Sequence, residues 1–127
     1  MDKVVHFEVP FDDLDRAKAF YASSFAWNLQ TSSMGGMEYT SVITTPSDDQ
    51  TGMPTEPGAI NGGLTQRGAE TPAPIVTVGV DSIDDALKRI EASGGTTVTP
   101  RTPIADMGAF AYFRDSEGNV LGLWETA

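Results

Sequence analysis

One pattern of residues occurs twice in this sequence, and that repeat constrains the fold more than any other feature. Residues 6–17 align with residues 75–86 at an offset of 69, and each segment reads as an alternating strand, an acidic turn and the start of an amphipathic helix. The apolar helix positions recur at the i, i+3 and i+7 spacing of a face that packs on a sheet; they are Leu14, Ala17 and Tyr21, matched by Ile83, Ala86 and Ile90. The chain is therefore expected to build one supersecondary unit twice.

The ends of the two halves also match, but at a different offset. Residues 61–66 align with residues 120–125 at an offset of 59, and the dipeptide Gly-Leu recurs in both segments. Because the two offsets differ by ten residues, the two halves are expected to differ in the length of their loops.

Alternation and turn-forming residues predict one helix and four strands in each half. In the first half we expect a strand at residues 3–9 and a helix that is capped by Asp12 or Asp13 and runs to about residue 25. Three short strands are expected to follow, at residues 28–31, 37–44 and 59–66. In the second half the same order falls at residues 75–80, 83–92, 96–99, 109–114 and 120–125. These elements predict an α+β fold of two tandem βαβββ modules, about 1–67 and about 74–127, within one domain of residues 1–127. The modules are expected to form a cupped, mostly antiparallel sheet with the helices outside and a cavity between them.

A polar segment separates two of the strands expected in the first half. Residues 46–58 contain three prolines and several Asp, Ser and Thr residues, a composition typical of loops. We expect this loop to be mobile and to shape the mouth of the cavity. Residues 68–74 are short enough to connect the two halves of one fold.

Composition limits the classes of function that remain open. The chain has 127 residues, of which 39% are apolar, enough for one globular domain with its own core. It has no cysteine, which excludes disulfides, thiolate catalysis and cysteine-based metal sites. The net charge is −10 and the basic residues are scattered, which argues against a nucleic-acid partner. No apolar run approaches the roughly 20 residues of a membrane span and the first residues lack the layout of a signal peptide, so we expect a cytoplasmic protein with no membrane contact.

The chain has a single histidine, His6, on the first expected strand, and the repeat matches it to Ile75. Glu8 lies two residues further along and so shares the face of His6. Four roles are open for His6: a buried histidine hydrogen-bonded to Glu8, a ligand contact, a metal ligand, or a general base, since neutral imidazole accepts protons near pH 7. His6 and Glu8 are therefore the candidate catalytic residues, although no nucleophile or oxyanion site stands beside them.

Three segments carry a family likeness. They are residues 6–21 with an Arg-Ala-x-x-Phe-Tyr helix, residues 60–64, and residues 110–125 with an Arg-Asp-x-Glu-Gly-Asn turn. Together they resemble the glyoxalase/bleomycin-resistance/dioxygenase superfamily, also called vicinal oxygen chelate, and the likeness spans nearly the whole chain. The resemblance implies paired βαβββ modules, commonly as a homodimer, and a small-molecule partner.

The resemblance also implies four positions for the ligands of a divalent metal ion, one on the first and one on the last strand of each module. The two offsets place these positions at His6 and Ile75, and near Gly63 and Gly122. Only one of the four carries a side chain that binds metals.

A carboxylate elsewhere is the remaining way to complete a metal site. Glu125 lies three residues past Gly122, an odd displacement that puts it on the opposite face of the strand unless a bulge intervenes. Glu8 and His6 are about 7 Å apart on one strand, and two further ligands are missing. We therefore expect no cofactor; a divalent metal held by His6 with Glu8 or Glu125 is the alternative.

Seven residues are expected to contact a ligand. The glycines would leave room in the cavity wall, Asn61 would present an amide, and Trp124, in phase with Gly122, would stack on a planar or cationic ligand. The full set is His6, Glu8, Asn61, Gly63, Thr77, Gly122 and Trp124. The remaining aromatic candidates are interpreted as core residues; they are Trp27, Tyr39 and Tyr112.

These features predict a small-molecule binding protein of the superfamily that lacks a catalytic metal. The resemblance suggests that it sequesters a drug-like or cationic metabolite, as antibiotic-resistance members do. The alternative is a lyase, isomerase or dioxygenase that uses a metal or the acid–base chemistry of His6 and Glu8. A third possibility is an interaction module whose cavity is filled by its own side chains.

Overall fold

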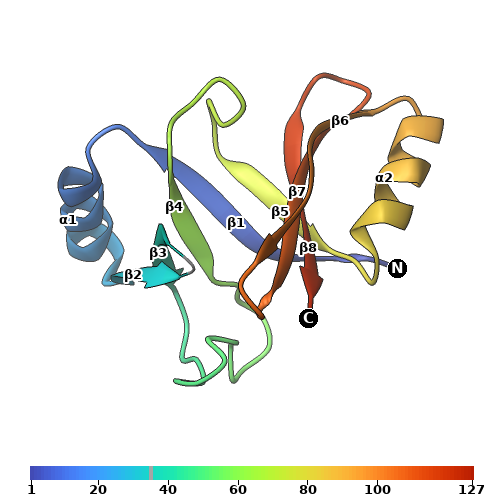
Figure 1. Cartoon of the computed structure of the whole chain (residues 1–127). Coiled ribbons are helices and arrows are strands. Elements are labelled where there is room, and N and C mark those ends of the chain that lie inside the picture. Colours follow the sequence, from blue (N-terminus) through green and yellow to red (C-terminus); the bar gives the residue numbers. More distant parts are fainter. Residues whose placement is uncertain (35) are drawn as a thin grey trace. The chain divides into compact units, whose positions relative to one another are not determined.

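The computed structural model describes residues 1–34 and 36–127, and within them the chain divides into two compact units (Figure 1). We call residues 6–74 the N-terminal unit, and residues 75–127 together with residues 1–5 the C-terminal unit. Each unit carries one helix and a sheet, and each is described by itself below.

The N-terminal unit has the order strand, helix, strand, strand, strand. Its elements are β1 (Lys3–Phe11), α1 (Leu14–Phe25), β2 (Asn28–Met34), β3 (Met37–Ile43) and β4 (Gly62–Gln66), where the first residues of β1 belong to the C-terminal unit. The strands lie in the order β2-β3-β4-β1; β4 and β1 pair parallel, and the other neighbours pair antiparallel. Asp13 caps α1, since its carboxylate accepts a hydrogen bond from the backbone nitrogen of Arg16 at 2.9 Å.

The C-terminal unit repeats this arrangement. Its elements are β5 (Ile75–Gly79), α2 (Ile83–Ala92), β6 (Thr96–Ile104), β7 (Gly108–Arg114) and β8 (Val120–Thr126). The strands lie in the order β5-β8-β7-β6, with β5 and β8 parallel and the other neighbours antiparallel. The expected α+β class, the two βαβββ modules and the mostly antiparallel pairing are therefore confirmed.

The largest difference from the expected elements is the length of β6. The strand was expected to end at Thr99, but it continues through Pro100 and Pro103 to Ile104. Proline cannot donate a hydrogen bond to a neighbouring strand, but an edge strand tolerates it. β6 is such an edge, and its register with β7 shifts on both sides of Thr99.

Strand pairing confirms the internal repeat residue by residue. Glu8 lies opposite Gly63 in the first module, and Thr77 lies opposite Gly122 in the second. The offset of 69 converts Glu8 into Thr77, and the offset of 59 converts Gly63 into Gly122. The first and last strands of both modules therefore share one register.

The two helices pack unequally. α2 buries Ile83, Ala86 and Leu87 in a core with Ala109, Ala111 and Leu123. No residue of α1 is fully buried, and Lys18 stands where the repeat places Leu87 in α2. Neither helix, in the part of the chain that is described, is long and apolar enough to cross a membrane.

The loop of residues 46–58, expected to be mobile, is folded on itself. Ser47 and Pro54 form an antiparallel bridge across it. Between them, the Asp48 carboxylate accepts hydrogen bonds from the backbone nitrogens of Gln50 and Thr51, both at 2.8 Å. Side-chain capping of this kind is a common way in which Asp closes a turn.

The unequal packing of the helices predicts unequal effects of matched substitutions. Leu87→Ala should lower the free energy of unfolding by about 2–4 kcal/mol, because it removes buried methyl groups from the core. Lys18→Ala, at the matched position of α1, should change it by less than about 0.5 kcal/mol. Urea unfolding followed by circular dichroism measures both, and equal losses would contradict this packing.

Candidate functional site

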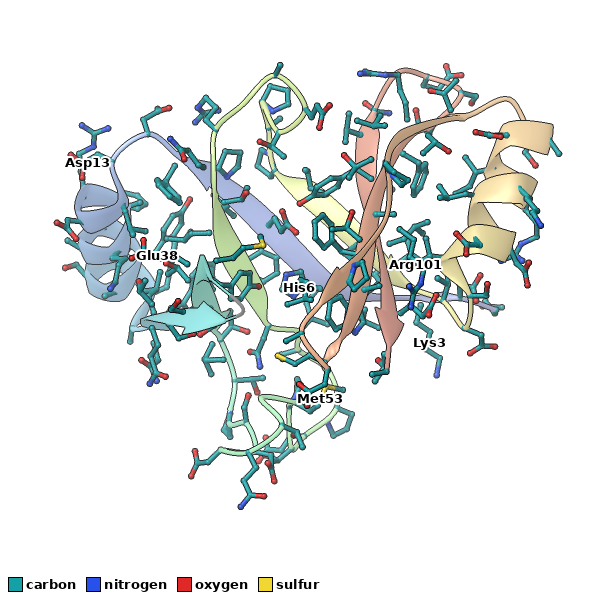
Figure 2. The ribbon with its side chains drawn as sticks, viewed as in Figure 1. Lys3, His6, Asp13, Glu38, Met53 and Arg101 are labelled. Atoms are coloured by element: carbon teal, nitrogen blue, oxygen red, sulfur yellow. The ribbon has the colours of Figure 1, made fainter. Side chains whose placement is uncertain are left out.

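A histidine and a tyrosine meet on one face of the N-terminal sheet. The Nε2 atom of His6, on β1, forms a hydrogen bond of 3.2 Å with the Tyr39 hydroxyl, on β3 (Figure 2 labels His6). The next residue, Phe7, points to the other face, where its ring lies 6.0 Å from that of Trp27. The His6–Tyr39 pair therefore lies on the opposite face of the sheet from the Phe7–Trp27 ring contact.

Burial keeps this pair uncharged. Loss of contact with water lowers the pKa of His6 to about 4, so the imidazole is neutral near pH 7. Burial, and next the negative charge of Glu8, raise the pKa of Tyr39 well above its ordinary value, so the phenol keeps its proton. Two neutral, hydrogen-bonded groups thus stand beside one carboxylate; His6 has a free electron pair near pH 7, but its lowered pKa makes it a weak general base.

Tyr39 also accounts for the glycine at the expected metal position on β4. A Cβ atom on Gly63 would overlap the hydroxyl and ring of Tyr39, so the glycine lets Tyr39 reach His6. This favours a packing role for Gly63 over the expected one of leaving room for a ligand. Tyr39 is a site residue that the sequence does not predict, because the register of β3, which brings its hydroxyl to His6, depends on strand pairing.

Asn61 anchors the loop of residues 46–58. Its Oδ1 accepts a hydrogen bond from the backbone nitrogen of Thr44 at 2.9 Å, and its Nδ2 donates to Ser47 Oγ at 2.7 Å and to the Gly52 carbonyl at 3.2 Å. Only 9% of the residue is exposed. The side-chain amide of Asn61 makes its hydrogen bonds to other groups of the protein, which favours a structural role for Asn61 over the expected contact with a ligand.

The matched position of the C-terminal unit holds Thr77 and Gly122. A Cβ atom on Gly122 would lie 2.6 Å from Thr77 Oγ1, too close for any side chain to fit there unless Thr77 moves. Thr77 is 4% exposed, and its Oγ1 has no hydrogen-bond partner among the described residues. A buried hydroxyl without a partner costs about 1–3 kcal/mol, so Thr77 Oγ1 lowers the stability of the folded protein.

Aromatic side chains share the sheet face of Thr77 and Gly122. Tyr112 lies opposite Gly122, and Phe110 lies opposite Trp124; directly paired residues point to the same face. The rings of Phe110 and Tyr112 meet edge to face at 5.6 Å, and Trp124 Nε1 donates to Thr126 Oγ1 at 3.1 Å. We call Phe110, Tyr112 and Trp124 the aromatic face; of these, only Trp124 is predicted from the sequence to contact a ligand.

The Glu125 side chain points toward α2, and both of its carboxylate oxygens accept hydrogen bonds. Its Oε2 accepts a hydrogen bond from the backbone nitrogen of Ile83 at 2.8 Å, at the first turn of α2, and its Oε1 lies 2.9 Å from Arg101 Nη2. The hydrogen bonds from Arg101 and then from Ile83 lower the pKa of Glu125. The register of β7 with β8 runs unbroken from Gly108 to Arg114, so no bulge turns Glu125 round, and its predicted orientation is confirmed.

The side chains present do not fit a metal ion of the kind that the superfamily implies. The four expected positions hold His6, Gly63, Ile75 and Gly122, and Ile75 is a core residue with 2% exposure. No group of three His, Cys, Asp or Glu side chains converges anywhere in residues 1–34 and 36–127. Zinc and related ions take three or four such ligands, so a site of His6 with Glu8 or Glu125 lacks donors.

The Arg-Asp-x-Glu-Gly-Asn motif forms the turn that leads into β8. The Asp115 carboxylate accepts hydrogen bonds from the backbone nitrogens of Asn119 at 2.8 Å and Glu117 at 2.9 Å. The Asn119 side chain donates to the same carboxylate at 3.0 Å. The motif thus fixes where β8 begins and with it the position of Gly122.

Proteins with similar sequences indicate the class to which these paired βαβββ modules belong. The bleomycin resistance protein-like N-terminal family matches residues 3–45. A Mycobacterium bovis protein named "Putative glyoxylase CFP32" is 27% identical over 115 residues, and the Mycobacterium tuberculosis protein of that name matches equally. The match covers 89% of this chain but 41% of those relatives, so the chain spans about two-fifths of their length.

Solved structures share the fold at low sequence identity. A methylmalonyl-CoA epimerase in complex with methylmalonyl-CoA and NH4+ has a TM-score of 0.68 at 15% identity, covering 100% of this chain and 96% of that one. The Mycobacterium tuberculosis methylmalonyl-CoA epimerase gives 0.62 at 16%, covering 98% and 87%. A hypothetical protein from Bacillus halodurans gives 0.67 at 15%, covering 99% and 95%. The chain is a member of the glyoxalase/bleomycin-resistance, or vicinal oxygen chelate, superfamily.

The lowered pKa of His6 predicts a loss of stability in mild acid. The unfolded chain binds a proton at His6 near pH 6.5, whereas the folded chain does so only near pH 4. The neutral, buried His6 therefore contributes up to about 3 kcal/mol to the free energy of unfolding above about pH 6.5. This contribution is lost as the pH falls to about 4. Imidazole resonances followed by NMR should titrate near pH 4.

Carboxylates also titrate in this range, so His6→Asn serves as the control. The difference in unfolding free energy between the wild type and this variant should shrink between pH 7 and pH 4. A His6 pKa near 6.5, or a difference that does not depend on pH, would contradict the burial described.

Proposed function

We propose that this protein binds a small molecule without the help of a metal ion, and that the ligand contacts the aromatic face of the C-terminal unit. The observation that carries the proposal is the buried Thr77 hydroxyl, which has no partner in the described part of the chain. A ligand group that hydrogen-bonds to Oγ1 would remove the cost of that buried polar atom. A buried polar atom without a partner calls for an explanation in a native structure, and a group that the chain itself does not supply is one.

The surroundings of Thr77 favour a planar ligand that is neutral or cationic. Phe110, Tyr112 and Trp124 offer ring faces and edges for stacking, and aromatic rings attract cations. The net charge of −10 attracts cations and repels anions at long range. The match of residues 3–45 to a bleomycin resistance protein-like family supports sequestration of a drug-like or cationic metabolite.

An acid–base enzyme is the alternative function, and the His6–Tyr39 hydrogen bond beside Glu8 is the observation that favours it. A neutral His6 would accept a proton from a substrate, and Tyr39 would hold the imidazole in place. The names of the relatives, a glyoxylase and an epimerase, support this alternative. Turnover that is lost in His6→Asn and impaired in Tyr39→Phe would favour it over binding alone.

If the ligand binds at Thr77, one substitution there should change both the stability of the ligand-free protein and its affinity for the ligand. Thr77→Val keeps the shape but removes the unpartnered hydroxyl, so the ligand-free protein should become more stable by about 1–3 kcal/mol. Its affinity for a ligand should fall about 2- to 12-fold, the worth of one hydrogen bond. Trp124→Ala should weaken the same ligand further, and Thr96→Val on the exposed start of β6 is the matched control.

A thermal-shift screen of planar cations and planar neutral compounds identifies the ligands, and calorimetry then measures the variants. The proposal fails if no compound binds, which would favour a cavity filled by side chains. It also fails if Thr77→Val leaves the affinity of every hit unchanged.

A further inference from the structure

A pocket lies between α2 and the sheet of the C-terminal unit. α2 lies beside β6, β7 and β8 (Figure 1), and the pocket has a volume of about 260 Å³. Its floor includes Val78 of β5, Phe113 of β7 and Leu123 of β8. Thr77 and Trp124 are the next residues along β5 and β8, so they point to the other face of the sheet. We call this site the helix pocket, and it is separate from the site proposed above.

The wall of the helix pocket is apolar. Four apolar residues pack against the buried core of this unit but are themselves only partly buried, and they are Val78, Val80, Ile90 and Phe113. All four line the helix pocket. Their exposed parts therefore meet in one concave site, where an apolar group of a ligand would be removed from water at a gain in free energy.

Two opposite charges stand at the rim of the helix pocket. Asp2 and Arg89 both line it, and Arg89 Nη2 lies 3.8 Å from Asp2 Oδ2. This distance is longer than a hydrogen bond, and the side chains of Arg89 and Asp2 are 62% and 52% exposed. An exposed ion pair of this kind is weak, so both residues can turn to the charges of a ligand.

The corresponding place in the N-terminal unit carries different side chains. The repeat matches Arg89 to Phe20 and Ile90 to Tyr21. Both matched residues are aromatic, and the ring of Tyr21 stacks on that of Trp27 at 5.3 Å. The βαβββ frame therefore does not require an arginine or a smaller apolar residue at these positions of the helix.

We propose that the helix pocket binds a free apolar amino acid, with its carboxylate on Arg89, its ammonium group on Asp2 and its side chain inside the pocket. An α-amino acid carries both charged groups on one carbon atom, so they can reach two rim residues whose charged atoms are 3.8 Å apart. A guanidinium donates paired hydrogen bonds to a carboxylate. Sites for drug-sized ligands measure about 300–1,000 Å³, so the pocket volume of about 260 Å³ suits a smaller ligand.

The charges at the rim disfavour ligands that carry only one charge. A fatty acid would place its carboxylate beside Asp2, and the net charge of −10 would repel it at long range. An apolar amine would place its ammonium group beside Arg89. A zwitterion has no net charge and offers a partner of opposite sign to both residues.

Three compounds with the same apolar group test whether the helix pocket recognises both charges. They are L-leucine, L-leucine amide, which lacks the carboxylate, and isocaproate, which lacks the ammonium group. In an NMR titration, leucine should shift the methyl resonances of Val78, Val80 and Ile90. It should bind at least about 10-fold more tightly than either analogue, because each analogue loses hydrogen bonds between charged groups. The proposal is overturned if leucine does not bind or if either analogue binds equally well.

Charge-neutralising substitutions at the rim test the assigned contacts. Arg89→Gln should lower the affinity for leucine at least about 10-fold, and Asp2→Asn should lower it as well. Lys88→Gln is the matched control, since it removes the same charge from the neighbouring position of α2, which does not line the helix pocket. The control should bind leucine as the wild type does. Equal losses in Arg89→Gln and Lys88→Gln would overturn the proposal.

Two further variants locate the bound leucine. Ile90→Tyr introduces the residue of the matched position in α1 and should abolish leucine binding, with an unchanged circular dichroism spectrum as evidence that the variant is folded. Thr77→Val changes the other face of the sheet. Leucine that loses affinity in Thr77→Val but not in Arg89→Gln would be bound at the aromatic face, which would overturn this proposal and leave the proposed function standing.

Discussion

Each module depends on one glycine of its last strand that packs tightly against a side chain of another strand. In the N-terminal unit Gly63 lies opposite Glu8 and beneath Tyr39, and in the C-terminal unit Gly122 lies against Thr77. Neither glycine can gain a side chain unless its neighbour moves. The glycines therefore fix the packing of the sheet, and they also occupy the positions at which metal-dependent relatives are expected to place a ligand.

The same frame holds different chemistry in the two units. In the N-terminal unit the contact brings a neutral histidine to a tyrosine, next to a carboxylate that disfavours ionisation of the phenol. In the C-terminal unit it leaves a buried hydroxyl among aromatic rings. The first arrangement suits proton transfer and the second suits recognition of a planar ligand. The unpartnered hydroxyl is the stronger evidence for a binding site, because it lowers the stability of the fold by an amount that a hydrogen-bonded ligand would restore.

Local signals in the sequence were enough to predict the module order, the repeat and the orientation of Glu125. Periodicity and parity depend only on neighbouring residues, and the regular register of β8 preserved both. The His6–Tyr39 contact and the anchoring of the loop by Asn61 were missed, since each depends on which strands and loops meet in space. The continuation of β6 through Pro100 was missed because an edge strand tolerates prolines that a central strand would not. The cavity between the modules stays a prediction.

The most direct test of this account is metal uptake by the folded protein. Wild type and His6→Ala, freed of metals and then dialysed against Zn²⁺, Ni²⁺, Mn²⁺ or Fe²⁺, are compared by elemental analysis. We expect no stoichiometric uptake by either protein, because no three His, Cys, Asp or Glu side chains converge in residues 1–34 and 36–127. One ion per wild-type chain that is lost in His6→Ala would contradict the account.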